Sequence, residues 1–391
     1  MIRRILMVIS LCIFAGPLLA QDLSNIQIHG FVTQGFLYSS HNNLFTMETS
    51  DGSARWTDAA VSLSDAISDK LHVGIQLHVY QLGELGGPNL QIDWATGDYR
   101  VNDRVKLVFG KVKTVYGLYN DSQDVDTVHL WTLLPESFYP VDNKNFTLAH
   151  YGADFYGTAD FGTRRGKVSY RAYAGYRSLD LTGGYALELG VPVVGSAFTT
   201  GGGNMFGADL RWQTPLKDLL VGVSAIVTNL NGTATTGSLH IPYLGEPVEF
   251  VKFERGKFMA ASEYKRVAPQ LDLHLNNVDP YGYPAPVIPY NVVAVEDQRS
   301  WYVMSSYRLT EKLQVGAYYS HTGNAHVNGK LPINYSNDAV ISGRFDFNSY
   351  FYAKLEGHFI NGTSLNYYVD TNPNGETTAT KMLAARIGFS F

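Results

Sequence analysis

Apolar and polar side chains alternate along most of this chain. In the segment 71–80, aliphatic residues occupy the odd positions from Leu71 to Val79, while His72, Gln76 and His78 lie among the even positions. Successive side chains of a β-strand point to opposite faces, so this period of two residues predicts strands. The same alternation recurs in the segments 104–109, 167–177, 313–320, 351–359 and 381–391.

The connections between these segments alternate between short and long. Short turns are expected at 68–70, 102–103, 163–166, 215–218, 255–257, 311–312 and 348–349. Long loops are expected at 41–53, 114–146, 181–203, 231–247, 268–298, 325–337 and 366–380, with 83–88 as a shorter member. Short turns at one rim and long loops at the other are typical of outer-membrane barrels.

We therefore predict an all-β fold, a transmembrane antiparallel up-and-down β-barrel of about 16 strands. Both ends of the mature chain would then lie at the short-turn rim. The pair of strands expected around the turn at 255–257 decides between about 16 and about 14 strands. On this map all 15 prolines fall in turns, loops or the leader segment, as expected for a residue that cannot donate to a strand ladder.

A soluble sandwich of sheets also alternates, with its apolar face turned inward. Here the polar face is often bulky and charged, and the apolar face is rich in Tyr and Phe near the strand ends. We therefore expect the apolar face to contact hydrocarbon and the polar face to line an aqueous bore.

The first 20 residues have the pattern of a secretory signal peptide. Arg3 and Arg4 precede an apolar run, and Ala20 is the small residue at the expected cleavage point. The single cysteine, Cys12, lies within this segment, so the mature domain 21–391 would have none. Removal of this segment takes away two arginines and no acidic residue, which shifts the formal net charge from −5 to −7. That charge excludes a nucleic-acid partner bound through bulk positive charge.

The connection 114–146 is too long for an ordinary turn and too apolar for a disordered loop. It contains Trp131, Phe138 and Tyr139 among its apolar residues. We expect it to fold into the barrel and form a constriction. The acidic residues that it would contribute are Asp121, Asp124, Asp126 and Glu136.

The chain ends on a strand pattern whose last residue, Phe391, is aromatic. With this end, the mature chain resembles the Gram-negative outer-membrane porins, general or phosphate-selective. The other motifs that carry the resemblance are Gly30-Phe31, Gly35-Phe36, Gly110-Lys-Val-Lys, Tyr116-Gly-Leu-Tyr-Asn-Asp and Leu134-Pro-Glu-Ser-Phe-Tyr. The resemblance implies 16 strands, a third loop folded into the pore, a homotrimer, and recognition of Phe391 by the barrel-insertion machinery. The dense run of lysines expected of a strongly phosphate-selective pore is absent.

We expect a passive diffusion channel for small hydrophilic solutes or ions, in the outer membrane and in contact with its lipid. Bases on the wall opposite acids on the constriction would favour polar solutes, with a weak preference for anions. The basic residues that we expect to line the bore are Lys106, Lys111, Lys113, Lys167, Arg171, Arg177, Arg211, Arg308, Arg344, Lys354 and Arg386.

Other classes of function have less support. His72 and His78 would lie about 20 Å apart on one strand, too far to share a metal ion, and no cofactor is expected. An outer-membrane lipase would need a Ser and a His on the lipid face, where only His321 beside Ser320 comes close. A plugged barrel that acts as a scaffold or sheath for a partner protein stays open as an alternative.

Overall fold

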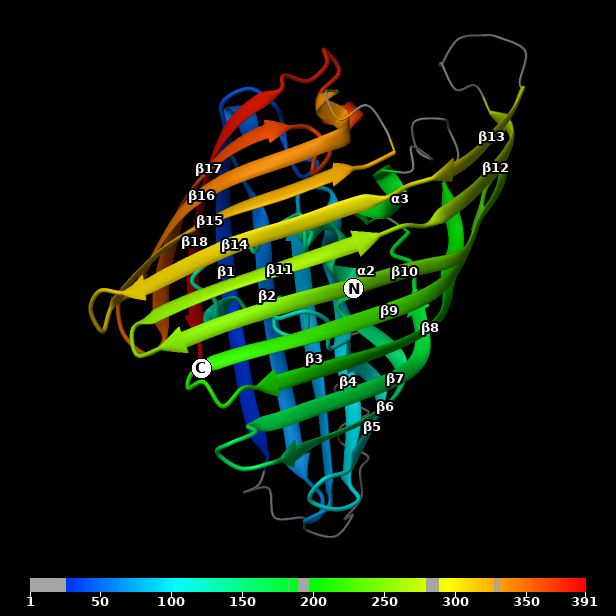
Figure 1. Cartoon of the computed structure of the whole chain (residues 1–391). Coiled ribbons are helices and arrows are strands. Elements are labelled where there is room, and N and C mark those ends of the chain that lie inside the picture. Colours follow the sequence, from blue (N-terminus) through cyan, green and yellow to red (C-terminus); the bar gives the residue numbers. More distant parts are fainter. Residues whose placement is uncertain (1–25, 182, 189–196, 279–287, 327–328, 330) are drawn as a thin grey trace, which may run out of the picture.

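Eighteen antiparallel strands form one sheet in the computed structural model, and all except β12 and β13 close into a ring of sixteen. The structure describes residues 26–181, 183–188, 197–278, 288–326, 329 and 331–391, so the predicted signal peptide lies outside the described residues. The all-β antiparallel barrel and its strand number are as predicted (Figure 1). The strands are β1 (Gln27–Ser39), β2 (Ser53–Ala66), β3 (Leu71–Leu82), β4 (Leu85–Arg100), β5 (Lys106–Lys113), β6 (Ala149–Asp160), β7 (Lys167–Ser178), β8 (Phe198–Gln213), β9 (Leu219–Ala234), β10 (Gly237–Arg255), β11 (Phe258–Val267), β12 (Gln270–Val278), β13 (Ile288–Val295), β14 (Gln298–Arg308), β15 (Leu313–Asn324), β16 (Tyr335–Asp346), β17 (Phe351–Gly362) and β18 (Ala379–Ser390).

The strands β12 and β13 form a hairpin that extends one side of the barrel beyond its rim (Figure 1). The outer part of β10 pairs with β12, whereas β11 pairs with β14 and continues the ring. The loops expected at 231–247 and 268–298 are therefore wrong as loops, because both contain strand residues. Strands outside the ring are held by backbone hydrogen bonds to the neighbouring strands. The Gly and Pro residues in these two stretches therefore did not exclude strands.

Prolines also occur within strands, contrary to the sequence map. Pro88 lies in β4, Pro289 in β13, and Pro242 and Pro247 in β10. Pro242 lies where the register between β9 and β10 shifts, between Ile241 and Leu244. Pro247 lies between the part of β10 that pairs with β12 and the part that pairs with β11. Both therefore occupy ladder positions where a missing N–H donor costs little.

The two faces of the sheet differ in the way that the sequence predicts. On β14 the outward Val303 is 54% exposed, whereas the inward neighbours Tyr302 and Met304 are at most 1% exposed. On β17 the outward Leu355 and Phe359 are similarly exposed, and charged or polar residues occupy the buried face. An exposed apolar face around a closed sheet is the reverse of a soluble fold and is typical of a membrane barrel. Among the described residues, no helix is long and apolar enough to cross a membrane.

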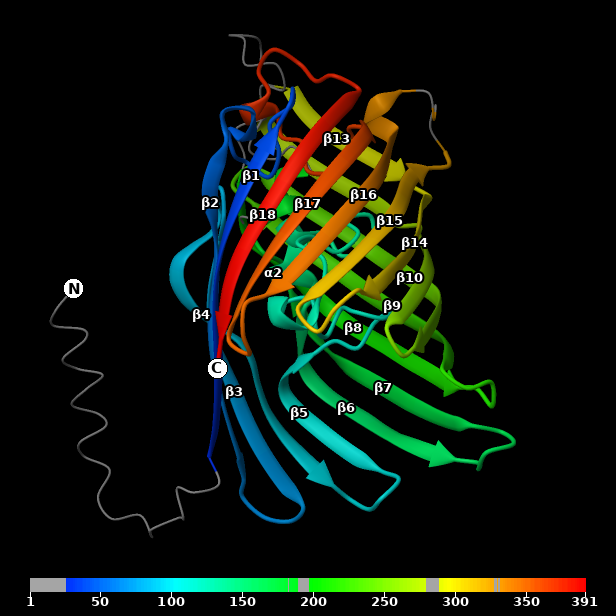
Figure 2. The same ribbon diagram turned by 90° about the vertical axis from the view of Figure 1, so that its left-hand side faces the viewer.

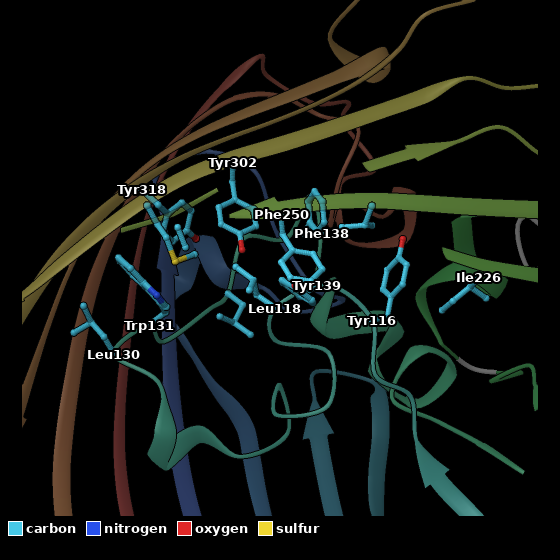
Figure 3. Close-up of a cluster of buried hydrophobic side chains, with 14 of the residues drawn as sticks. Tyr116, Leu118, Leu130, Trp131, Phe138, Tyr139, Ile226, Phe250, Tyr302 and Tyr318 are labelled. Carbon is cyan, nitrogen blue, oxygen red and sulfur yellow. The ribbon is translucent and has the colours of Figure 1, made fainter. Parts of the chain in front are cut away.

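The chain between β5 and β6 forms no strand. It contains the 3-10 turns Asp126–Val128 and Val141–Asn143 and the short helix α2 (Lys144–Thr147). A second short helix, α3 (Gly184–Glu188), lies between β7 and β8. We call residues 114–148 the β5–β6 segment. Its apolar side chains join inward side chains of eight strands in one buried cluster (Figure 3). The members are Tyr116, Leu118, Leu130, Trp131, Leu134, Phe138 and Tyr139 of the segment, and Tyr173, Met205, Ile226, Val248, Phe250, Ala261, Tyr302, Met304, Tyr318 and Val340 of the strands.

The ring closes where the first and last strands meet (Figure 2). Phe391 donates its backbone N–H to the carbonyl of Gly30 and accepts the N–H of Gly30, both at 3.0 Å. The ring of Phe391 lies over Gly30, where a Cβ would come within 2.6 Å of it. The terminal residue therefore extends the seam through its backbone and covers it with its side chain.

We predict that deletion of Phe391 lowers the free energy of unfolding of the detergent-folded barrel by about 1–3 kcal/mol, because two seam hydrogen bonds are lost. Phe391→Ala keeps both backbone bonds, so we expect a smaller loss. Urea unfolding followed by tryptophan fluorescence measures both. Equal losses in the two variants would contradict a contribution of the backbone bonds.

Candidate functional site

Two inward glutamates hold the backbone of the β5–β6 segment. Glu263 of β11 accepts the N–H of Leu118 at 2.6 Å and hydroxyl hydrogen bonds from Tyr139 and Tyr302. Glu356 of β17 accepts the N–H groups of Thr132 and Leu133 at 3.1 and 2.9 Å. Both carboxylates are at most 2% exposed. A buried backbone without secondary structure must find partners elsewhere, and these side chains supply them.

Inward bases hold the carbonyl groups of the same segment. Lys354 donates to the carbonyls of Asp126 and Trp131 at 2.7 and 3.0 Å. Arg344 donates to the carbonyl of His129 at 3.0 Å, and Arg211 donates to that of Gly117 at 2.7 Å. These bases come from β17, β16 and β8, so the segment is held from well-separated positions around the ring.

Asp126 connects the segment to an ion network. Its carboxylate lies 2.9 Å from both Lys354 Nζ and Arg386 Nη1, and the hydroxyl of Tyr352 donates to it. Burial alone would raise the pKa of Asp126, but Arg386 and Lys354 outweigh it and lower the pKa. Asp126 is therefore an anion held between two cations.

The network continues from Arg386 to β2 and β3. Arg386 lies 3.3 Å from Asp58, which also pairs with Lys144 of α2 at 3.1 Å. Both ring nitrogens of His78 contact carboxylates, one of Asp58 and one of Asp93. All of these side chains are less than 9% exposed. The charges of the inner wall and of the segment therefore neutralise each other within one connected network.

Asp121 and Asp124 occupy different surroundings. Asp124 is buried, pairs with Lys113 at 2.7 Å and accepts a hydrogen bond from Gln76 of β3. Asp121 is half-buried and makes no ion pair among the described residues. Of the four acids predicted for the segment, two are thus paired with bases.

Glu136 is buried without a basic partner among the described residues. Its Oε2 accepts the N–H of Val141 at 3.0 Å, and its Oε1 has no hydrogen-bond partner. Burial and nearby Asp142 raise the pKa of Glu136. Glu136 lines two small cavities, of about 30 and about 20 Å³. Each is little larger than one water molecule needs.

The predicted basic residues fall into three groups. Six lie on the inner face near the short-turn rim and stay partly exposed: Lys106, Lys167, Arg171, Arg211, Arg308 and Arg344. Four more contact the β5–β6 segment, as Arg211 and Arg344 also do, or lie deep in the wall: Lys113, Arg177, Lys354 and Arg386. Lys111 differs from the prediction, because it alternates with the inward positions and its amine contacts the outward Tyr151 ring.

Sequence reasoning missed several side chains that hold the segment. Lys144 and Lys265 were not singled out, although Lys144 pairs with Asp58 and Lys265 donates to the carbonyl of Phe138. Lys265 alternates in phase with Glu263, so the face of β11 could have identified it. No such signal exists for Lys144, because its position depends on the path of an irregular segment. Among the described residues, no group of three or more His, Cys, Asp or Glu could hold a metal ion.

Solved structures with the same fold are outer-membrane proteins. The anion-selective porin from Comamonas acidovorans has a TM-score of 0.57 at 9% sequence identity, and the alignment covers 94% of this chain and 99% of the porin chain. The outer membrane channel DcaP of Acinetobacter baumannii has a TM-score of 0.56 at 12% identity, over 94% and 97% of the two chains. The trimer form of OmpT, an outer membrane protein of Vibrio cholerae, has a TM-score of 0.56 at 12% identity, over 94% and 99%.

No protein-family model matches the sequence, and no curated protein is significantly similar to it. The likeness to the solved structures therefore concerns the fold. It is the porin fold that the sequence resemblance implied.

The buried acids of the segment make its packing depend on pH. Burial raises the pKa of Asp142 to about 6, although Tyr368 and Asn143 donate hydrogen bonds that lower it. The native state therefore binds a proton more tightly than the unfolded chain does. This stabilisation is complete below the unfolded pKa of about 4 and is lost as the pH rises to about 6.

We predict that Asp142→Asn removes this loss and raises the free energy of unfolding at pH 8 by up to about 3 kcal/mol, with little effect at pH 4. Urea unfolding at both pH values measures the effect. Asp69→Asn, in an exposed turn, is the control. A gain of equal size at pH 4 and pH 8 would refute the assignment to proton binding.

Proposed function

We propose that this protein is an outer-membrane diffusion channel for small hydrophilic solutes or ions, exported through a signal peptide and assembled as a homotrimer by the barrel-insertion machinery. The exposed apolar face of the ring suits a position in the membrane, and the charged inner face suits contact with water. The channel fold of similar structures supports the same role. No chemical reaction belongs to this proposal.

The β5–β6 segment is the proposed constriction. Its hydrogen bonds to Glu263, Glu356, Lys354 and Arg211 connect it to strands on different sides of the ring. A solute that follows the inner wall must therefore pass this segment. This set of contacts is the observation that carries the proposal.

Several partly exposed bases of the inner wall are paired with acids. Arg171 pairs with Asp154 at 3.2 Å, Arg211 with Asp209 at 2.8 Å, and Arg344 with Asp346 at 2.8 Å. Lys106 and Lys167 make no ion pair among the described residues, and both lie near the short-turn rim. This balance supports the proposed weak preference for anions.

A plugged barrel is the second candidate. Two of the cavities between the segment and the wall hold only about 30 and about 20 Å³, and Lys354, Glu356 and Arg386 are buried beneath the segment. In that case the barrel would carry a partner protein rather than solutes. A lipase has less support, because His321 bonds to Asn337 and Ser320 is buried on the opposite face.

Thiol labelling tests the constriction, because the mature sequence contains no cysteine. Thr127 of the segment lines an open cavity of about 370 Å³ with His29 and Ser62 of the first strands. We predict that Thr127→Cys conducts in planar bilayers and that a bulky, charged thiol reagent reduces its current by about half or more.

Lys257→Cys, in an exposed short turn, is the matched control and should keep its current after labelling. An unchanged current in labelled Thr127→Cys would contradict the constriction. Absence of any current from folded, unlabelled protein would instead favour the plugged barrel.

Selectivity gives a separate test. We predict that the double variant Lys106→Gln, Lys167→Gln moves the reversal potential in a salt gradient toward cations, because it removes the two unpaired inner bases. Lys217→Gln and Lys257→Gln, in short turns, are the charge-matched control. A wild-type channel that already prefers cations would contradict the proposed preference.

A further inference from the structure

A polar pocket lies on the outward face of the barrel at the long-loop rim. Its volume is about 500 Å³, and its lining includes Arg299 of β14, His321 of β15, Asn337 of β16 and Asn361 of β17. Register places His321 opposite Asn337, and Asn337 opposite Asn361. The three side chains therefore form one polar row across neighbouring strands. None of the four was predicted to line the bore.

The pocket borders the apolar face that would contact hydrocarbon. Two positions along β14 from Arg299 lies Trp301, which is 36% exposed, and its ring is 5.5 Å from Tyr319 and 5.9 Å from His321. Phe359, two positions from Asn361, is 53% exposed. The aromatic rings thus separate the polar row from the apolar surface of the strands, as at a membrane–water interface.

Two arginines lie at the rim beside the pocket. Arg266 and Arg299 are directly paired across β11 and β14, and both contact the same carboxylate, that of Asp297. Both arginine side chains are 50% exposed, so part of each guanidinium faces solvent. Two guanidinium groups carry more N–H donors than the one carboxylate of Asp297 accepts, and the remaining donors suit a phosphate group.

The asparagine row suits sugar hydroxyls. Asn337 Oδ1 accepts hydrogen bonds from Tyr319 and from a ring nitrogen of His321, at 3.2 and 2.7 Å. The amide nitrogen of Asn337 makes no hydrogen bond within the described part of the chain, so it can donate to a ligand. The exposed faces of Trp301 and Tyr319 can contact a sugar ring. An ordinary phospholipid would use the arginines but not the asparagine row.

We infer that this pocket binds the headgroup of a phosphorylated glycolipid of the outer leaflet. The phosphate binds Arg299 and Arg266, the sugars bind the Asn337 and Asn361 amides, and the acyl chains lie along the apolar face below Trp301 and Phe359. The inference rests on the proposed outer-membrane location. It does not depend on whether the bore conducts.

Native mass spectrometry of the detergent-folded protein tests this site, with a bisphosphorylated disaccharide lipid of the lipid A type as probe. We expect Arg299→Gln to weaken binding about tenfold, since a charge-assisted hydrogen bond is lost. Asn337→Ala with Asn361→Ala should weaken it without a change of charge. Arg255→Gln, whose side chain is 73% exposed at the opposite rim, is the control and should bind normally.

Three further probes distinguish the ligand classes. The dephosphorylated glycolipid, the soluble phosphorylated disaccharide without acyl chains, and phosphatidylglycerol should each bind more weakly than the complete glycolipid. Equal binding of any of them, or normal binding by Arg299→Gln, would overturn the inference. Heat-modifiable migration in gels confirms that each variant is folded. Conductance of wild-type protein in glycolipid-free bilayers tests the channel separately.

Discussion

The need to satisfy a buried backbone controls the interior of this barrel. The β5–β6 segment has almost no regular secondary structure of its own, so its N–H and C=O groups require partners from elsewhere. Inward carboxylates accept its N–H groups, and inward lysines and arginines donate to its carbonyls. These charges would be costly to bury alone, but the segment and the wall neutralise each other. This arrangement explains why many of the charged side chains that the sequence places on the inner wall are buried in the structure.

The same arrangement connects packing with electrostatics. The apolar residues of the segment lie against the inward Tyr302, Tyr318 and Phe250, on the side of the ring formed by β7–β11 and β14–β16 (Figure 3). Its ion pairs lie on the opposite side, with Asp58, Lys354 and Arg386. The segment is thus amphipathic in space, although its sequence has no simple period. Glu136 and Asp142 are the exceptions, because neither pairs with a base among the described residues and burial raises the pKa of both carboxyl groups.

The strands were predictable because the alternation recurs on several strands of the ring and is read directly from the sequence. The turn at 255–257 decided the strand number, and β10 and β11 pair on either side of it. The β12–β13 hairpin was missed because the whole proline-containing stretch 268–298 was assigned to one long loop, although β12 itself contains neither glycine nor proline. The inward direction of the Lys106 and Lys354 side chains followed from the alternation. The partners of Lys144 and Glu136 did not, because they depend on the path of an irregular segment.

The pairing of β1 with β18 has a consequence for the order of folding. Phe31 pairs with Ser390, so the two ends of the polypeptide meet at the last junction of the ring. Every other neighbouring pair, apart from β11 with β14 and the outer part of β10 with β12, forms between consecutive strands. The circle therefore cannot be completed before the final strand has been synthesised, and until then both terminal edges have unpaired hydrogen-bonding groups. A chain exported as proposed must be kept from aggregating on the way, and the absence of cysteine after residue 12 spares it misplaced disulfides.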